Sequence, residues 1–126
     1  MKIELKNNML QPEVKNTQAL LTQATAENLY VNLVNQLQKD VQLANLEWML
    51  PEDVTPSQLI IYLHEFIYQL ISHRFTAYLN LLYIIDVSED KIKALDGSDL
   101  VALAKNVSFL ILKREWQKVW LKNTYQ

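Results

Sequence analysis

The sequence contains no cysteine, one glycine and three prolines among its 126 residues. Without cysteine, the chain cannot form a disulfide, a thiolate metal site or a thiol nucleophile. A single glycine also excludes a glycine-rich phosphate-binding loop. Because glycine and proline are the strongest breakers of regular structure, their scarcity predicts long helices separated by few turns.

The chain also lacks a long apolar run and an excess of either charge. Half of its residues are hydrophobic, but polar residues at His64, Glu65, His73 and Arg74 interrupt the longest apolar candidate. That segment therefore falls short of the roughly 18 residues that a membrane span needs. The formal net charge of -2 predicts no general attraction to nucleic acid or anionic lipid. We expect one domain, no secretory signal, no membrane partner and a cytoplasmic location.

Residues 55–87 are predicted to form one long central helix. Thr55 and Gln58 match a capping box, and Pro56 stands at the first helical position, where its missing N–H costs nothing. Apolar residues then repeat at intervals of three and four, which places them on one face. This face comprises Leu59, Leu63, Phe66, Ile67, Leu70, Ala77, Leu81 and Ile85. A second apolar row lies beside it, so this helix needs neighbours on two sides.

Two further long helices are predicted on either side of the central one. A one-sided apolar stripe indicates a helix from Thr25 to about Met49. Ser98 is placed to cap a last helix that runs to about Lys122. The connection after Met49 is short, which favours antiparallel neighbours.

A short helix and an N-terminal arm complete the predicted fold. Ser88 is placed to cap the short helix, and Gly97 is expected to end it in the left-handed conformation. Residues 1–24 show no sustained period, which predicts a partly ordered arm. The predicted fold is therefore all-α: a bundle of three long antiparallel helices plus one short helix over residues 25–126.

The last predicted helix carries two opposed apolar faces. One face is expected to pack on the central helix, and the other would form an apolar surface. The second face comprises Phe109, Leu112, Trp116, Val119 and Trp120. Two interpretations stay open, because either the N-terminal arm or the short helix covers these side chains, or they form the seam of a homodimer.

Arg74 stands in the middle of the central apolar stripe, and the pattern therefore predicts a buried guanidinium. A buried charge needs partners, because leaving it unpaired would cost several kcal/mol. The candidate partners are the carboxylates Asp40, Glu47, Asp86 and Glu115, with Arg114 in the same or a second network. The two interpretations are an ion pair that fixes the helix register and a site that recognises an anion.

No motif predicts catalysis, a cofactor or a metal site. His64 and His73 lie on opposite faces of the predicted helix, and no glutamate is followed three positions later by histidine, as the carboxylate-bridged metal bundles require. A basic and aromatic cluster near the C-terminus is the one feature typical of nucleic-acid binding. It comprises Lys113, Arg114, Trp116, Lys118, Trp120, Lys122 and Tyr125. Glu115 interrupts this cluster and the chain is slightly acidic, so nucleic acid is not the favoured partner.

Residues 83–91 and 112–120 resemble segments of small all-helical bacterial proteins that have no assigned activity. The resemblance covers about the C-terminal half and implies a compact helical domain, with no chemistry attached. We therefore expect a non-enzymatic protein-interaction or assembly module that uses the apolar face of its last helix, with a homodimer or another protein as partner. The alternatives are a bundle that binds a small molecule or an anion at Arg74 and a weak nucleic-acid binder.

Overall fold

The computed structural model describes residues 14–124, and within this range all regular secondary structure is helical, with no strand. The prediction of an all-α fold is confirmed. The helices are α2 (Thr17–Ala26), α3 (Tyr30–Leu43), α4 (Pro56–His73), α5 (Phe75–Ile85), α6 (Glu89–Lys93) and α7 (Leu100–Thr124).

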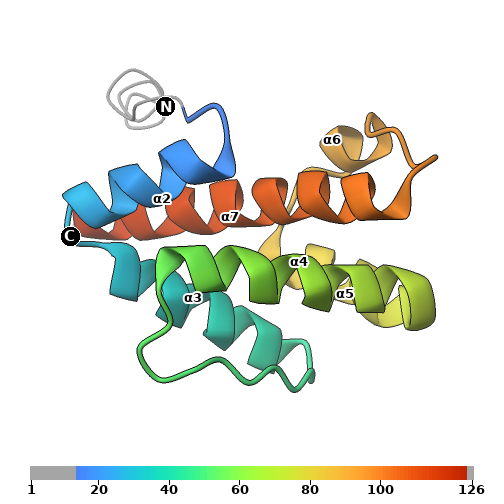
Figure 1. The fold of residues 1–126 in the computed structure, drawn as a ribbon, viewed down its shortest axis with the longest axis horizontal. Helices are drawn as coiled ribbons and strands as arrows, with labels where there is room; N and C mark the ends of the chain where they lie inside the picture. Colours follow the sequence, from blue (N-terminus) through green and yellow to red (C-terminus); the bar gives the residue numbers. More distant parts are fainter. Residues whose placement is uncertain (1–13, 125–126) are drawn as a thin grey trace.

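α7 is the central element of the fold. It contains 25 residues, and α2, α3, α4 and α5 all pack against it. Figure 1 shows α7 along the length of the molecule, with α2 on one side and α3 and α4 on the other. The colours also show that α4 runs opposite to α7, whereas α2 runs in the same direction as α7. The predicted bundle of three long antiparallel helices is not confirmed, because the described residues form six helices.

The predicted central helix breaks at Arg74. This residue has φ -142° and ψ 61°, so α4 ends at His73 and α5 begins at Phe75. The physical reason is length, because a continuous helix over residues 55–87 would be about 50 Å long, whereas α7 spans about 37 Å. About the last quarter of such a helix would extend beyond the end of α7. By turning back at Arg74, the chain places Tyr78, Leu81 and other apolar residues of α5 in the core.

Side chains set the helix starts as expected, with one correction. The Gln58 N–H donates to Thr55 Oγ1 at 3.2 Å and the Thr55 N–H donates to Gln58 Oε1 at 3.0 Å, which confirms the capping box. Ser88 accepts from the Lys91 N–H at the start of α6. The cap of α7 lies one residue later than predicted, because Asp99 Oδ1 accepts from the Val101 N–H at 3.0 Å.

Left-handed backbone is supplied by polar residues rather than by glycine. Asn28, Asn45 and Asp86 have positive φ, whereas Gly97 does not, so the predicted left-handed Gly97 is wrong. Asparagine and aspartate tolerate this conformation better than other residues with a side chain. Asn28 separates α2 from α3, and Asn45 follows the end of α3. These turns explain why the predicted helix over residues 25–49 is shorter, spanning Tyr30–Leu43.

The predicted N-terminal arm contains a helix that belongs to the core. α2 begins at Thr17, where Asn16 caps it by accepting the Ala19 N–H at 2.8 Å. Its residues Leu20, Leu21 and Ala24 are buried in the same core as the apolar residues of α7. The predicted boundary between residues 24 and 25 therefore falls inside α2. Residues 1–13 of the predicted arm lie outside the described residues.

Candidate functional site

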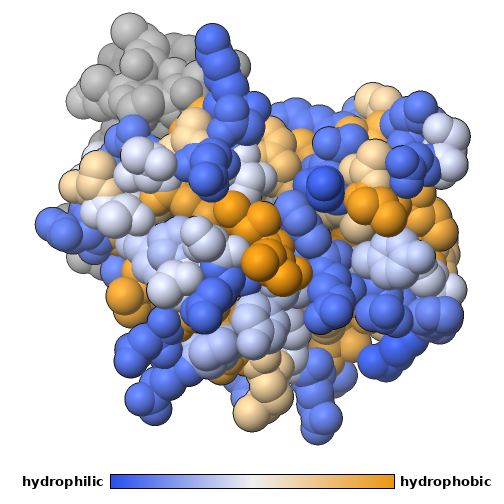
Figure 2. Space-filling view, viewed as in Figure 1, coloured by the Kyte–Doolittle hydropathy of each residue, from blue (hydrophilic) through white to orange (hydrophobic). Residues whose placement is uncertain are grey.

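The predicted interface on the last helix is not a surface. Leu112, Trp116, Val119 and Trp120 are buried within the chain, and Phe109 is half-buried. α2 packs on one side of α7 while α3 and α4 pack on the other, so both apolar faces have neighbours. The structure thus agrees with the interpretation in which a segment near the N-terminus covers this stripe. Figure 2 shows the face that α4 and α7 share as mostly hydrophilic, with hydrophobic residues mainly between the two helices and toward one end.

The predicted buried network around Arg74 does not exist as one unit. Arg74 is exposed and makes no ion pair with any residue in the range 14–124, because the chain turns there instead of continuing into the core. Glu47 is also exposed. The candidate anion site at Arg74 is therefore a surface position and not an internal one.

Arg114 and Asp86 form a separate clamp at the surface. Arg114 Nη2 lies 3.0 Å from Asp86 Oδ2, and Arg114 Nε donates to the Asp86 carbonyl at 3.1 Å. The Asp86 side chain is 78% exposed, so its ion pair adds little to stability. Its role is positional, because it ties the end of α5 to the middle of α7.

A buried acidic pair joins α3 to α7. Asp40 on α3 and Glu115 on α7 are both buried, and Lys118 reaches between them. Lys118 Nζ lies 2.8 Å from Asp40 Oδ2 and 3.1 Å from Glu115 Oε1, while its side chain stays 22% exposed. Gln36 Nε2 donates to both oxygens of Asp40 at 3.3 Å. The two predicted carboxylates are therefore brought together by a lysine that had been assigned to the basic cluster.

The two carboxyl groups hold different charges. Burial, and to a smaller extent the neighbouring Asp40, raises the pKa of Glu115 to about 9, although the positive charge of Lys118 acts to lower it. Burial alone would raise the pKa of Asp40, but hydrogen bonds from Glu115, Lys118 and Gln36 outweigh that effect and lower it. At neutral pH Glu115 is therefore neutral, whereas Asp40 is ionised and pairs with Lys118.

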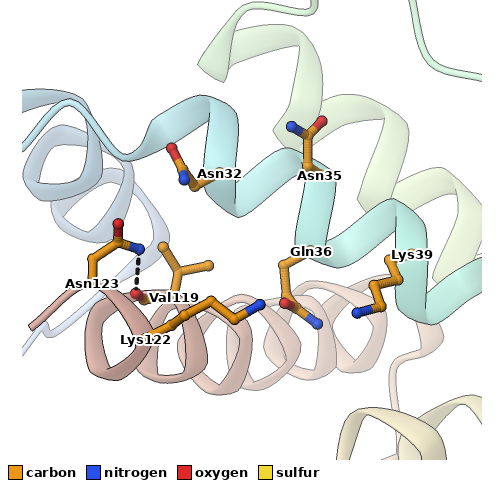
Figure 3. Close-up of a pocket in the computed structure, with 7 residues that line it drawn as sticks. All are labelled: Asn32, Asn35, Gln36, Lys39, Val119, Lys122 and Asn123. Carbon is orange, nitrogen blue, oxygen red and sulfur yellow. Dashed lines mark hydrogen bonds between the residues drawn. The ribbon is translucent and has the colours of Figure 1, made fainter. Parts of the chain in front are cut away.

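A polar pocket of about 190 Å³ lies beside this pair, between α3 and α7. Its residues are Asn32, Asn35, Gln36, Lys39, Val119, Lys122 and Asn123. Figure 3 shows Lys39 and Lys122 reaching toward Gln36 from the two helices. Sequence analysis did not identify this pocket. The available signal was the polar spacing of Asn32, Gln36 and Lys39, which only indicated a solvent-facing side of the helix.

An exposed apolar stripe runs along α5. Phe75, Leu79 and Tyr83 recur every four residues and are 55%, 49% and 80% exposed. The opposite side of the same helix buries Tyr78, Leu81, Leu82 and Ile85 in the core. α5 therefore has apolar residues on both sides, and only one side is covered by the rest of the chain. The sequence also predicts a second apolar row on the helix over residues 55–87, but with neighbouring helices that cover it.

The basic and aromatic cluster cannot act as a stacking platform. Trp116 and Trp120 are buried, Arg114 is held by Asp86 and Lys118 is held by the buried acidic pair. Tyr125 lies outside the described residues. Stacking on nucleobases needs exposed rings next to free cations, so the described part of this cluster does not support nucleic-acid binding.

Residues 14–124 include no group of three or more metal-ligating side chains that could hold an ion. Along the same residues, no helix is both long enough and apolar enough to cross a membrane. No family model matches the chain, and neither a curated protein nor a solved structure gives a significant match. The resemblance of residues 83–91 and 112–120 to small helical bacterial proteins stays a prediction.

Proposed function

We propose that the protein is a non-enzymatic interaction module that self-associates through the exposed stripe of α5, defined by Phe75, Leu79 and Tyr83. The observation that carries this proposal is the exposure of three large apolar side chains on one face of a helix whose other face is buried. A continuous apolar face of this kind marks an interaction surface more often than scattered single residues do. The partner surface thus moves from the last helix, where sequence analysis placed it, to α5.

The order of residues along α5 favours a second copy of the chain as the partner. No residue from Phe75 to Ile85 is charged, while Arg74 precedes the helix and Asp86 follows it. Two α5 helices packed antiparallel about a two-fold axis at Leu79 would place Phe75 of each copy against Tyr83 of the partner subunit. The same arrangement brings Arg74 of one copy near Asp86 of the partner subunit, a carboxylate that Arg114 of its own chain already pairs. The stripe is therefore self-complementary in the placement of its apolar residues, as a two-fold interface requires.

The buried acidic pair supports a non-enzymatic role. Asp40 and Glu115 are buried carboxyl groups with shifted pKa values, and perturbed groups are the usual candidates for acid–base chemistry. Both are enclosed in the core, where a substrate could not come within hydrogen-bonding distance. Their arrangement suits a structural link between α3 and α7.

The proposed seam is small, which sets the expected strength of the association. Stable protein interfaces usually bury at least about 1,200 Å² in total, and two copies of an 11-residue helix offer less than that. The dimer is therefore expected to be reversible and to depend on concentration in the micromolar range or above.

The experiment measures mass by light scattering over a series of protein concentrations. The unchanged protein should rise from the monomer mass toward the dimer mass as concentration increases. Leu79→Glu should remain monomeric, because it places two like charges at the centre of the seam. Leu43→Glu is the matched control, since Leu43 is also an exposed leucine at 59% but lies on α3. A protein that stays monomeric throughout, or two variants that associate equally well, would contradict the proposal.

Charge variants test the antiparallel arrangement. Arg74→Glu should weaken the dimer, because it would place an acidic group near Asp86 of the partner subunit. Asp86→Asn should restore part of the lost affinity when added to Arg74→Glu, and asparagine tolerates the left-handed backbone at this position, where φ is 71°. If the second change weakens association further, the charges do not meet across the seam.

A further inference from the structure

The pocket between α3 and α7 has the chemistry of a small binding site. Two lysines and four amide side chains line it, and none of the seven described residues that form it is acidic. Lys39 comes from α3 and Lys122 from α7, and Figure 3 shows both ammonium groups directed to the part of the pocket near Gln36. Two converging cations without a carboxylate between them create a positive potential in a concave site.

Neither lysine is engaged within the part of the chain that the structure describes. Lys118, one turn from Lys122, is held by Asp40 and Glu115, whereas Lys39 and Lys122 make no ion pair with any residue in the range 14–124. Asp40 lies behind the pocket, but Lys118 neutralises its charge and Gln36 occupies both of its oxygens. The local charge of the pocket is thus close to +2, which an anion with two negative charges would balance.

The amide groups define what else the ligand must carry. Gln36 uses its Nε2 on Asp40, and Asn123 uses its Nδ2 on the Val119 carbonyl at 2.8 Å, so each has a carbonyl oxygen left to accept. Figure 3 shows the Asn35 amide directed away from Gln36 and Lys122. The amide of Asn32 can both donate and accept. Groups of this kind are suited to hydroxyls, which also donate and accept.

We propose that this pocket binds a small phosphate monoester that carries hydroxyl groups, the chemical class of the sugar phosphates. A phosphate monoester has a charge of about -1.5 to -2 at pH 7, which matches two lysines, whereas a monocarboxylate would leave one unbalanced. The pocket is smaller than the roughly 300 Å³ at which ordinary ligand pockets begin, which suits a ligand of the size of a sugar phosphate. This inference does not depend on the self-association of α5.

Isothermal titration calorimetry on the full chain can test the site with three probes: glucose 6-phosphate, inorganic phosphate and glucose. Glucose 6-phosphate should bind most tightly, inorganic phosphate more weakly, and glucose without measurable heat. Added salt should weaken both phosphate probes, because the lysines are exposed and their charges are screened. Measurable glucose binding as strong as that of glucose 6-phosphate would overturn the phosphate assignment, and no binding of either phosphate probe would overturn the site.

Paired variants separate this pocket from a general charge effect. The double variant Lys39→Gln with Lys122→Gln should weaken glucose 6-phosphate binding by about tenfold for each lysine. The control is Lys91→Gln with Lys105→Gln, which makes the same charge change at exposed positions outside the pocket and should leave binding unchanged. Equal weakening by both doubles would show non-specific attraction and would overturn the proposal.

A single variant tests whether an amide of the pocket binds the hydroxyl groups of the sugar. Asn123→Ala should weaken glucose 6-phosphate binding and leave inorganic phosphate binding unchanged, because only the sugar probe carries hydroxyl groups for this amide. Loss of both to the same extent would contradict the hydroxyl assignment. All these positions are exposed, so the variants should unfold at the same denaturant concentration as the unchanged protein, which serves as the check on folding.

Discussion

α5 and α7 are both apolar on more than one side, but the fold covers both sides of α7 and only one side of α5. α7 lies between α2 on one side and α3 and α4 on the other, and nine of its residues are buried, Trp116 and Trp120 among them. α5 packs on α3, α4 and α7 and leaves Phe75, Leu79 and Tyr83 exposed. A hydrophobic pattern states how much surface must be covered. The position of the helix in the fold decides whether the chain itself supplies the cover.

The largest expected effect comes from truncating one aromatic ring on each helix. Trp116→Ala should lower the free energy of unfolding by about 3–5 kcal/mol, because it removes a large side chain that is only 1% exposed. Tyr83→Ala should change it by less than about 0.5 kcal/mol, since Tyr83 is mostly exposed. Urea unfolding followed by circular dichroism measures both. Similar losses in the two variants would show that the stripe on α5 is part of the monomer's core.

Removing a charged residue should also cost more stability on α7 than at the start of α5. Lys118→Met should destabilise the fold by about 2 kcal/mol, because it leaves the buried Asp40 carboxylate without its cation. Arg74→Met, at the exposed start of α5, should be neutral within about 0.5 kcal/mol. The same urea unfolding experiment ranks them. If Arg74→Met is the more harmful change, the turn at Arg74 depends on its side chain.

The buried carboxyl group on α7 should make stability depend on pH. Its pKa is raised from 4.5 to about 9 in the folded chain, so between these values the unfolded chain releases the Glu115 proton and the folded chain keeps it. Stability must therefore fall as pH rises through this window, by up to about 1.4 kcal/mol per pH unit. Glu115→Gln keeps the shape and a donor but removes the titration, so its advantage over the unchanged protein should grow between about pH 5 and pH 8.

Asp40 contributes with the opposite sign and in another window. Its pKa is lowered from 3.8, so the stability that it supplies is present above that value and is lost as pH falls through its folded pKa. Measurements above about pH 5 therefore avoid the Asp40 titration. The comparison with Glu115→Gln also cancels the contribution of His64, whose pKa is lowered from 6.5 by burial and by Lys105. A difference between Glu115→Gln and the unchanged protein that does not vary with pH would mean that Glu115 is already ionised in the fold.

The smallest expected effect on folding concerns the uncovered side of α5. Asn80 is exposed beside the apolar stripe, and Asn80→Lys should leave the free energy of unfolding unchanged within about 0.5 kcal/mol. The added charge should nevertheless weaken self-association, because two lysines would meet near the two-fold axis. Light scattering and urea unfolding on the same sample separate the two effects. A large loss of stability would place Asn80 in an internal contact.

The sequence predicts those parts of the fold that depend on neighbours along the chain. The all-helical class, the capping box at Thr55 and the Ser88 cap of α6 all depend on residues within one turn of each other. The break at Arg74 has no such signal, because neither glycine nor proline occurs near it. It follows from the length of α7, which is a property of the whole fold. α2 was not predicted for the same reason, because its apolar residues are buried against α7, at the other end of the sequence.

For the candidate sites too, some residues could be named from the sequence, but their contacts could not. Asp40 and Glu115 are both predicted from the sequence as members of a buried polar network, although as partners of Arg74. Their contact through Lys118 depends on how α3 crosses α7, which no local pattern specifies. The pocket beside them combines residues from the same two helices, about 80 positions apart in sequence. Its existence could be found only from the fold.

The central position of α7 also affects the order in which the chain can fold during synthesis. α7 is the last described helix to leave the ribosome, yet α2, α3, α4 and α5 all pack on it. Until it emerges, the earlier helices have only one another to cover their apolar faces, and contacts between distant segments form slowly. Incomplete chains that end before α7 should therefore expose the surfaces of α2 and α4 that α7 normally covers. They would be prone to aggregation and proteolysis until the last helix docks.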